Sequence, residues 1–187
     1  MNRLEKLLSR IAGILDREGI PYMIIGGQAV LIHGEPRFTR DIDITLGVSV
    51  ENAAHFEKAL AKNDFKPACE NPASFARETN VFPVMDKHSK VRVDFLFSDL
   101  PYERAAIARA ESVLVAGTAV RFIRADDLLI YKLIAGRPRD IEDASGIWAR
   151  KKKDINLVYI QEWLSRFSAL DELKDILERW NSVKRSC

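Results

Sequence analysis

The chain has 187 residues, a formal net charge of +2, and a composition of 47% hydrophobic and 30% charged residues. A chain of this length forms one domain, or one domain with a small appendage, and it can bury a core without disulfides or metals. The composition excludes a disordered chain, and the near-neutral charge gives no whole-chain signal for nucleic-acid binding.

The first elements follow from apolar spacing and glycine. Apolar residues recur at helical spacing between Leu4 and Leu15, which predicts an amphipathic helix that Gly19 ends. Tyr22–Ile25 is a short apolar run bounded by glycines, which is typical of a buried strand. The pair Gly26-Gly27 follows directly, and residues 28–33 have the composition of a short helix.

The middle of the chain is rich in strands and the last third is helical. Residues 41–46 alternate between polar and apolar, which predicts a strand. The further predicted elements are a helix over 50–62, a strand fragment and loop over 65–76, strands over 81–85 and 90–97, a helix over 102–110, a hairpin over 113–123, and helices over 126–135, 138–152, 156–167 and 170–182.

This segregation of strands and helices predicts the α+β class, with a small mixed sheet flanked by helices. We expect a domain over residues 1–124, followed by a helical region over 125–187 that packs on it. No internal repeat or low-complexity segment interrupts the chain.

Three carboxylates are the strongest chemical signal. Asp41 and Asp43 lie at positions i and i+2 of one predicted strand, so both side chains point to the same face. Asp94 lies on the polar face of a later amphipathic strand. If the two strands are neighbours, the three carboxylates converge and form an oxygen-rich site that selects Mg²⁺. The alternative is that all three are solvent-facing residues of half-exposed strands.

The glycine pair adds a second signal. Gly26 and Gly27 stand between a buried strand and a helix, where glycine lets the backbone approach a phosphate and the helix start offers free N–H groups. An ordinary strand-to-helix turn is the alternative. Because the pair precedes the Asp41–Asp43 strand by one short helix and a loop, a phosphate cradle and a metal site would be neighbours.

These motifs carry a resemblance to a known family. Ile25-Gly26-Gly27, followed by Asp41-Ile42-Asp43 and the later Asp94, resembles the signature of the DNA polymerase β-like nucleotidyltransferase superfamily. Gly26–Val30 with Phe38–Asp43 is similar to the AbiEii-type branch, which includes toxins of toxin–antitoxin systems, and so are the stretches around Lys132 and Asp140. The resemblance covers roughly residues 20 to 145 and does not extend to the final helices.

The resemblance implies the nucleotidyltransferase fold and a role for each motif residue. Gly26 and Gly27 would contact the triphosphate of an NTP, and Thr39 and Arg40 would assist there. Asp41 and Asp43 would bind two Mg²⁺ ions, which Mn²⁺ can replace, and Asp94 would help deprotonate the acceptor hydroxyl through the catalytic metal. Lys132, on a predicted helix, would neutralise phosphate charge, and Asp140 and Asp143 would position Lys132 or Arg139.

The expected reaction is transfer of a nucleoside monophosphate from an NTP to a hydroxyl acceptor, with release of pyrophosphate. The acceptor could be RNA, such as a tRNA 3′ end, in a toxin with a cognate antitoxin protein. Two alternatives stay open: a small-molecule, antibiotic-type nucleotidyltransferase, and a non-enzymatic module of the same fold that binds a nucleotide or a partner. The basic run Arg150–Lys153 could contribute to an RNA groove or could be a solvated helix end.

Cysteine content and hydropathy bear on the compartment. Cys69 and Cys187 are far apart and form no CxxC pair, which excludes a disulfide scaffold and a cysteine zinc site and fits a reducing compartment. No stretch approaches the roughly 20 apolar residues of a membrane helix. The charged N-terminal segment lacks the apolar core of a signal peptide. We therefore expect a cytoplasmic protein with no membrane partner.

Overall fold

The structure is a computed structural model that describes residues 3–98 and 100–186. The chain forms two compact units: the first holds residues up to Gln28 together with Thr39–Ile123, and the second holds Ala29–Phe38 and the chain from Arg124 onward. Cys187 lies outside the described residues, and Cys69 is half-buried with a free thiol. Within the described residues, no helix combines the length and apolar content needed to cross a membrane.

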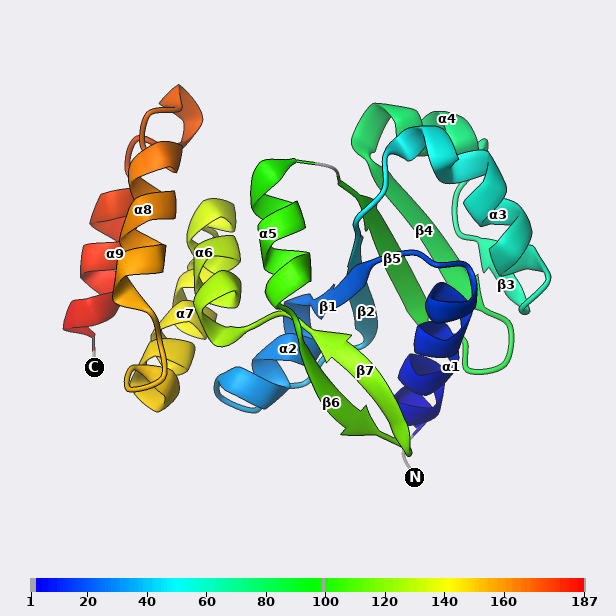
Figure 1. The fold of residues 1–187 in the computed structure, drawn as a ribbon, viewed down its shortest axis with the longest axis horizontal. Coiled ribbons are helices and arrows are strands. Elements are labelled where there is room, and N and C mark those ends of the chain that lie inside the picture. The colour runs from blue at the N-terminus through cyan, green and yellow to red at the C-terminus, as the bar shows by residue number, and fades with distance from the viewer. Residues whose placement is uncertain (1–2, 99, 187) are drawn as a thin grey trace. The chain divides into compact units, whose positions relative to one another are not determined.

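The first unit is built on a mixed sheet, as predicted for an α+β protein (Figure 1). Within the described residues its strand order is β3-β4-β5-β2-β1-β7-β6. The strands are β1 (Tyr22–Ile25), β2 (Asp41–Leu46), β3 (Phe65–Pro67), β4 (Val81–Asp86), β5 (Arg92–Phe97), β6 (Glu111–Val115) and β7 (Thr118–Phe122). β2 runs parallel to β5 and antiparallel to β1, and β1 runs parallel to β7.

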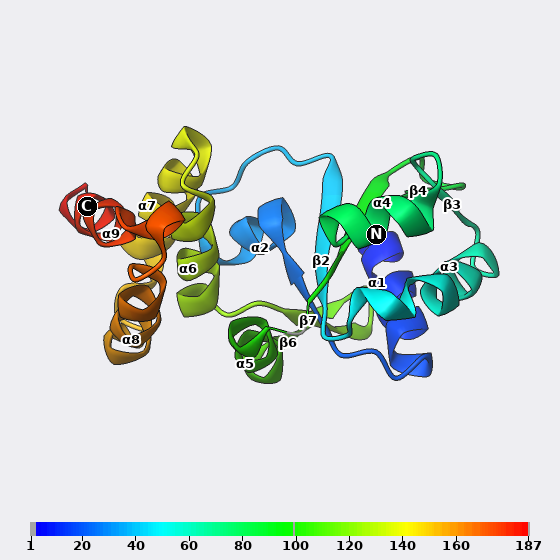
Figure 2. The same cartoon turned by 90° about the horizontal axis from the view of Figure 1, so that it is seen from above.

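Helices cover this sheet through an aromatic and aliphatic core. The helices of the first unit are α1 (Arg3–Arg17), α3 (Ala53–Ala61) with a 3₁₀ turn before it (Val50–Asn52), α4 (Pro72–Thr79) and α5 (Pro101–Arg109). Phe56 of α3 packs edge to face against Phe82, Phe95 and Phe97 at centroid distances of 6.0, 4.8 and 5.6 Å. Helices α3 and α4 lie with β3 and β4 at one end of this unit (Figure 2).

Two local predictions were wrong for reasons that involve proline and glycine. The segment 65–76 was expected to be strand fragment and loop, but α4 begins at Pro72, because proline has no N–H to lose in the first turn of a helix. Helix α2 (Gly26–His33) begins at Gly26 rather than Gln28, so both glycines form its first turn. Of its residues, Ala29–His33 belong to the second unit.

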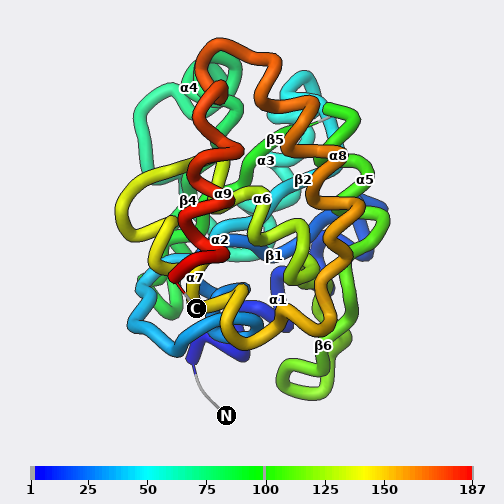
Figure 3. Tube along the Cα trace, turned by 90° about the vertical axis from the view of Figure 1, so that its left-hand side faces the viewer, coloured from blue at the N-terminus to red at the C-terminus, as the bar shows by residue number. Residues whose placement is uncertain are grey.

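The second unit is helical. It contains α6 (Ala125–Ala135), α7 (Pro138–Lys151), α8 (Leu157–Phe167) and α9 (Ile176–Arg185), with a 3₁₀ turn (Asp171–Leu173) where the last helix was expected to begin. α6 packs on α7 and α8, and α7 packs on α9. Trp148 and Trp180 meet edge to face at a centroid distance of 5.2 Å. Helices α8 and α9 run side by side (Figure 3).

Candidate functional site

Sheet register brings the predicted carboxylates onto neighbouring strands. Asp41 pairs with Arg92 and Asp43 pairs with Asp94 across the parallel strands β2 and β5. On its other side, Asp43 pairs with Ile25, the last residue of β1. The residues between and after the carboxylates, Ile42 and Ile44, are fully buried on the opposite face of the strand. The condition set by the sequence, that the two acidic strands be neighbours, is therefore met.

Gly26 fits against the carboxylate of Asp43. Its φ is +61°, in the left-handed region that glycine adopts without steric cost. A Cβ at this position would overlap the Asp43 side chain at Oδ2 and Cγ. The first residue of α2 must therefore be glycine both for its backbone angle and for the space that the carboxylate occupies. Gly27 follows within the first turn and is buried.

Two polar side chains hold the start of β2. The hydroxyl of Thr39 donates to Asp41 Oδ1 at 3.1 Å. The buried side chain of Gln28, in the first turn of α2, donates from Nε2 to the Asp41 carbonyl at 3.4 Å. The turn that carries Gly26 and the strand that carries the carboxylates are thus tied at a second point. Arg40 is exposed immediately before this strand.

Asp94 is bound by a cation from its own strand. Arg92 Nε lies 2.8 Å from Asp94 Oδ1 and 3.1 Å from Oδ2. The Arg92 side chain is 52% exposed and that of Asp94 is 18% exposed, so the pair lies at the surface of the sheet. The hydrogen bonds that Arg92 donates to Asp94, and the negative charge of Asp94, raise the pKa of Arg92, and the charges of Asp41 and Asp43 act in the same direction. Arg92 therefore lies in the field of all three carboxylates.

The donor set fits a divalent cation, but the side chains are not yet arranged around one. Across residues 3–98 and 100–186, no group of three His, Cys, Asp or Glu side chains is placed to hold a metal ion as it stands. In this arrangement Asp94 accepts hydrogen bonds from Arg92. Three carboxylates on adjacent strands nevertheless offer the hard oxygen ligands that Mg²⁺ and Mn²⁺ take. To bind the ion together with Asp41 and Asp43, Asp94 would have to release Arg92.

Lys132 lies in the second unit, within a buried ionic network. Its Nζ is 2.8 Å from Asp140 Oδ1 and 2.8 Å from Asp143 Oδ2, and its side chain is 9% exposed. Both carboxylates that the sequence placed beside Lys132 or Arg139 thus contact Lys132.

Two arginines complete this network. Arg37 binds Asp143 through Nε at 2.9 Å and through a terminal nitrogen at 3.2 Å. Arg137 Nε donates to Asp140 Oδ2 at 2.6 Å. Burial raises the pKa of Asp140, but the hydrogen bonds from Arg137 and Lys132 outweigh it, and the pKa is lowered. Three cations therefore surround two carboxylates, which leaves the network with an excess of positive charge.

The sequence interpretation did not single out Arg92 and Arg37. For Arg92 a signal existed, because a residue two positions before Asp94 on a strand shares its face. For Arg37 no local signal existed, because its partner Asp143 is separated from it by 106 residues.

Comparison with known proteins identifies the family. A family model described as nucleotidyl transferase of unknown function (DUF2204) matches residues 4–179. No curated protein sequence matches the chain. A solved structure of an antigenic nucleotidyltransferase-like protein from Paracoccidioides brasiliensis is similar, with a TM-score of 0.59 and 19% identity over 97% of this chain and 88% of that one.

Two solved antibiotic-modifying enzymes are also similar. ANT(2″)-Ia in complex with adenylyl-2″-tobramycin has a TM-score of 0.57 and 17% identity over 96% of this chain and 99% of that one. The lincosamide adenylyltransferase LnuA, bound to lincomycin, has a TM-score of 0.50 and 15% identity over 79% and 96% of the two chains. These likenesses establish the nucleotidyltransferase fold, and the family match extends over nearly the whole chain; the protein belongs to the DUF2204 family of nucleotidyl transferases.

Proposed function

We propose that the first unit transfers a nucleoside monophosphate from an NTP to a hydroxyl acceptor, using divalent ions held by Asp41, Asp43 and Asp94. The observation that carries this proposal is the position of Asp43, which pairs with Asp94 on one side while its carboxylate fills the space beside Gly26. A phosphate held by the first turn of α2 would therefore lie next to the acidic residues.

The chain's own groups divide the work. The N–H groups of the α2 first turn, at Gly26 and Gly27, would bind the triphosphate, because a helix start attracts anions. Thr39 and Arg40 flank the same strand end and would contact phosphate oxygens. When bound, the divalent ions would supply Lewis-acid stabilisation of the charge that develops on the phosphates.

The reaction balances without an additional reactant. The acceptor oxygen forms a bond to the α-phosphorus, and the bond between that phosphorus and the oxygen bridging to the β-phosphate breaks, so pyrophosphate leaves. The proton of the acceptor hydroxyl goes to a carboxylate oxygen of Asp94, which Arg92 must first release. For Lys132 we propose the role that the sequence resemblance implies, neutralisation of phosphate charge.

We propose RNA as the acceptor class, with a toxin of the AbiEii type and a cognate antitoxin as its setting. The alternative acceptor is a small hydroxylated antibiotic, of the kind bound in the ANT(2″)-Ia and LnuA structures. The test is incubation with each α-³²P-labelled NTP, Mg²⁺ and either total RNA or an aminoglycoside.

The control variants make this test decisive. Asp43→Asn keeps the shape of the side chain beside Gly26 and removes its charge, whereas Asp154→Asn makes the same change at an exposed position of the second unit. Label on RNA with the wild type and Asp154→Asn, but not with Asp43→Asn, supports the proposal. Label on the aminoglycoside moves the acceptor to a small molecule. Full transfer by Asp43→Asn would overturn the assignment of the site.

A further inference from the structure

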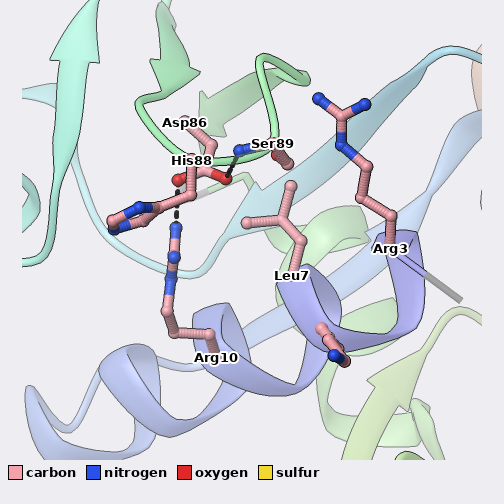
Figure 4. Close-up of a pocket in the computed structure, with 7 residues that line it drawn as sticks. Arg3, Leu7, Arg10, Asp86, His88 and Ser89 are labelled. Carbon is pink, nitrogen blue, oxygen red and sulfur yellow. Dashed lines mark hydrogen bonds and ion pairs between the residues drawn. The ribbon is translucent and has the colours of Figure 1, made fainter. Parts of the chain in front are cut away.

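A cavity of about 470 Å³ opens between helix α1 and the turn that joins β4 to β5, all within the first unit. Helix α1 lines it with Arg3, Lys6, Leu7 and Arg10, which recur along one face of the helix. Leu7 is buried and forms an apolar floor, while Arg3 and Lys6 are exposed. Figure 4 shows Arg3 and Arg10 reaching from α1 toward the turn, with Leu7 between them.

The opposite wall comes from Asp86, His88 and Ser89. Asp86 is the acidic residue of this lining, and it is already neutralised: it binds Arg10 and accepts the backbone N–H of Ser89 at 2.7 Å. His88 lies on the turn, 3.2 Å from the exposed Asp64. Since Asp86 takes up the charge of one cation, the lining keeps a positive excess.

The cations of this lining have unused capacity. In the part of the chain that the structure describes, no acidic side chain forms an ion pair with Arg3 or Lys6. Arg10 binds Asp86 through a terminal nitrogen, and its Nε has no acceptor among the described residues. A pocket of nucleotide size, with an apolar floor and unpaired cations, suits an anion that also carries an apolar surface.

This pocket is distinct from the carboxylate site but shares one end of the sheet with it. Asp86 lies on the face of β4 that carries Phe82, whereas Asp94 lies on the other face of the sheet, since residue 94 pairs with residue 83. Asp86 ends β4, and Arg92, which pairs with Asp41, begins β5 after a short turn. The two sites are thus separated by the end of the sheet.

Basic residues continue from the pocket around this strand end. Lys87 and Lys90 lie on the turn, and both are exposed. Lys66 of β3 pairs with Met85, which in turn pairs with Arg92 on the carboxylate face. Asp64, which directly precedes β3, is exposed and forms ion pairs with Lys87 and His88 of this turn. Basic side chains therefore connect the two faces of the sheet.

We propose that the pocket between α1 and the β4–β5 turn binds the phosphodiester backbone of an RNA acceptor whose 3′ end reaches the carboxylate site. Residues 3 and 10 are about 10 Å apart along the helix axis. This distance exceeds the width of a single phosphate group and suits several consecutive phosphates of one strand. Leu7 offers a surface for a sugar or base, and Lys66, Lys87 and Lys90 follow the backbone around the strand end. This inference rests on the proposed nucleotidyl transfer for the role of the bound RNA.

The test measures binding of a 5′-labelled single-stranded oligoribonucleotide by fluorescence anisotropy over a range of salt concentrations. The variant is Arg3→Ala/Lys6→Ala. Neither side chain forms an ion pair or hydrogen bond with a described residue, so the substitutions should leave the fold intact. The matched control is Lys58→Ala/Lys62→Ala, which removes the same charge from exposed positions of α3 and its C-terminal cap. NTP affinity is measured separately by equilibrium dialysis.

We expect the Kd for RNA to rise roughly tenfold in the α1 variant and by less than about twofold in the control, with a salt slope smaller by about 1 to 2. NTP affinity should stay unchanged in both. Equal weakening in the two variants, or no RNA binding by the wild type, would overturn the proposal. So would a pocket that binds inorganic phosphate through Arg3 and Lys6 while RNA affinity is unaffected.

The two proposals fail in different ways. RNA binding that depends on Arg3 and Lys6, with no nucleotidyl transfer to any acceptor, would contradict the proposed function and support the RNA-binding role of the pocket. Transfer to a small molecule by a wild type that binds no RNA would contradict the RNA-binding role of the pocket and support nucleotidyl transfer.

Discussion

Arg92 Nε lies 2.8 and 3.1 Å from the two carboxylate oxygens of Asp94. Asp94 itself lies directly opposite Asp43 on the neighbouring strand. Like charges opposite each other on adjacent strands destabilise a sheet. Arg92 offsets this repulsion with a charge that comes from the chain itself. A divalent ion bound by the same carboxylates would take over that role, so the guanidinium and the ion would compete for Asp94.

The first prediction concerns this competition. Arg92→Ala should lower the free energy of unfolding of the metal-free protein by about 1 kcal/mol, the upper end for an exposed pair. The same substitution should tighten Mn²⁺ binding by about fivefold, because the ion no longer displaces a cation. Isothermal titration with Mn²⁺ and urea denaturation measure the two effects.

Arg77→Ala, at an exposed position of α4, is the control for loss of one positive charge. It should change neither quantity by more than the general effect of net charge. Weaker Mn²⁺ binding by Arg92→Ala than by Arg77→Ala would show that Arg92 assists the ion rather than competes with it.

The second prediction separates the two demands on Gly26. Gly26→Ala adds a methyl group where the Asp43 carboxylate lies, in a backbone with φ +61°. Gly19→Ala makes the same change at φ +64°, where nothing lies within 4 Å of the added Cβ. Gly19→Ala should cost about 1 to 2 kcal/mol, the penalty for the left-handed backbone alone.

Gly26→Ala should cost more than Gly19→Ala, and it should also lower kcat/KM by on the order of 100-fold because Asp43 is displaced. Thermal unfolding and steady-state kinetics provide the comparison. If both variants lost the same stability and Gly26→Ala kept its activity, close packing against Asp43 would have no functional role.

The sequence predicts those parts of this site that depend on local periodicity. Asp41 and Asp43 were placed on one strand face because apolar residues alternate with them, and burial of Ile42 and Ile44 confirms that alternation. The α+β class followed in the same way, from strand and helix patterns in separate parts of the chain. The glycine pair was found as a local motif, although its position inside the first turn of α2 was not.

Features that depend on distant contacts were beyond local pattern. The pairing of β1 with β7 joins Ile24 to Phe122, and nothing in either segment specifies the partner. Helix α4 lies in a segment for which the sequence predicts strand and loop, because proline breaks a helix when it stands inside one, whereas Pro72 is the first residue of this helix. The assignment of Ala29–Phe38 to the second unit likewise depends on contacts made far along the chain.

The third prediction is a pH effect at Asp86. Burial raises the pKa of this carboxyl, but the hydrogen bonds from Ser89 and Arg10 outweigh burial, and the pKa is lowered from 3.8 to about 2. Because the folded pKa is below the unfolded one, the carboxylate stabilises the protein fully above the unfolded pKa. That contribution disappears as the pH falls from the unfolded pKa through the folded one.

Asp86→Asn removes this titration while keeping the acceptor for the Ser89 N–H. The wild type should lose about 2 kcal/mol more unfolding free energy than Asp86→Asn as the pH is lowered from about 5 to about 2. Urea denaturation at a series of pH values gives both curves. Parallel curves would contradict a lowered pKa at Asp86.

The fourth prediction concerns the contribution of Lys132 to stability and its proposed role in neutralising phosphate charge. Lys132→Met removes a cation that is 2.8 Å from both Asp140 and Asp143 and nearly buried. Breaking a buried pair from one side costs about 3 to 5 kcal/mol, and the remaining bonds from Arg37 and Arg137 should hold this loss near the lower end. Lys153→Met, at an exposed position after α7, is the control and should be neutral.

The double variant Lys132→Met/Asp140→Asn distinguishes the charge effect from lost packing. If the uncompensated carboxylate causes the loss of stability, removing its charge should restore a large part of that stability. NTP affinity, measured by equilibrium dialysis on folded protein, should be reduced in Lys132→Met and should not recover in the double variant. Recovery of both would make Lys132 a purely structural residue. No recovery of stability would place its role in packing of the α6 side chain rather than in the ionic network.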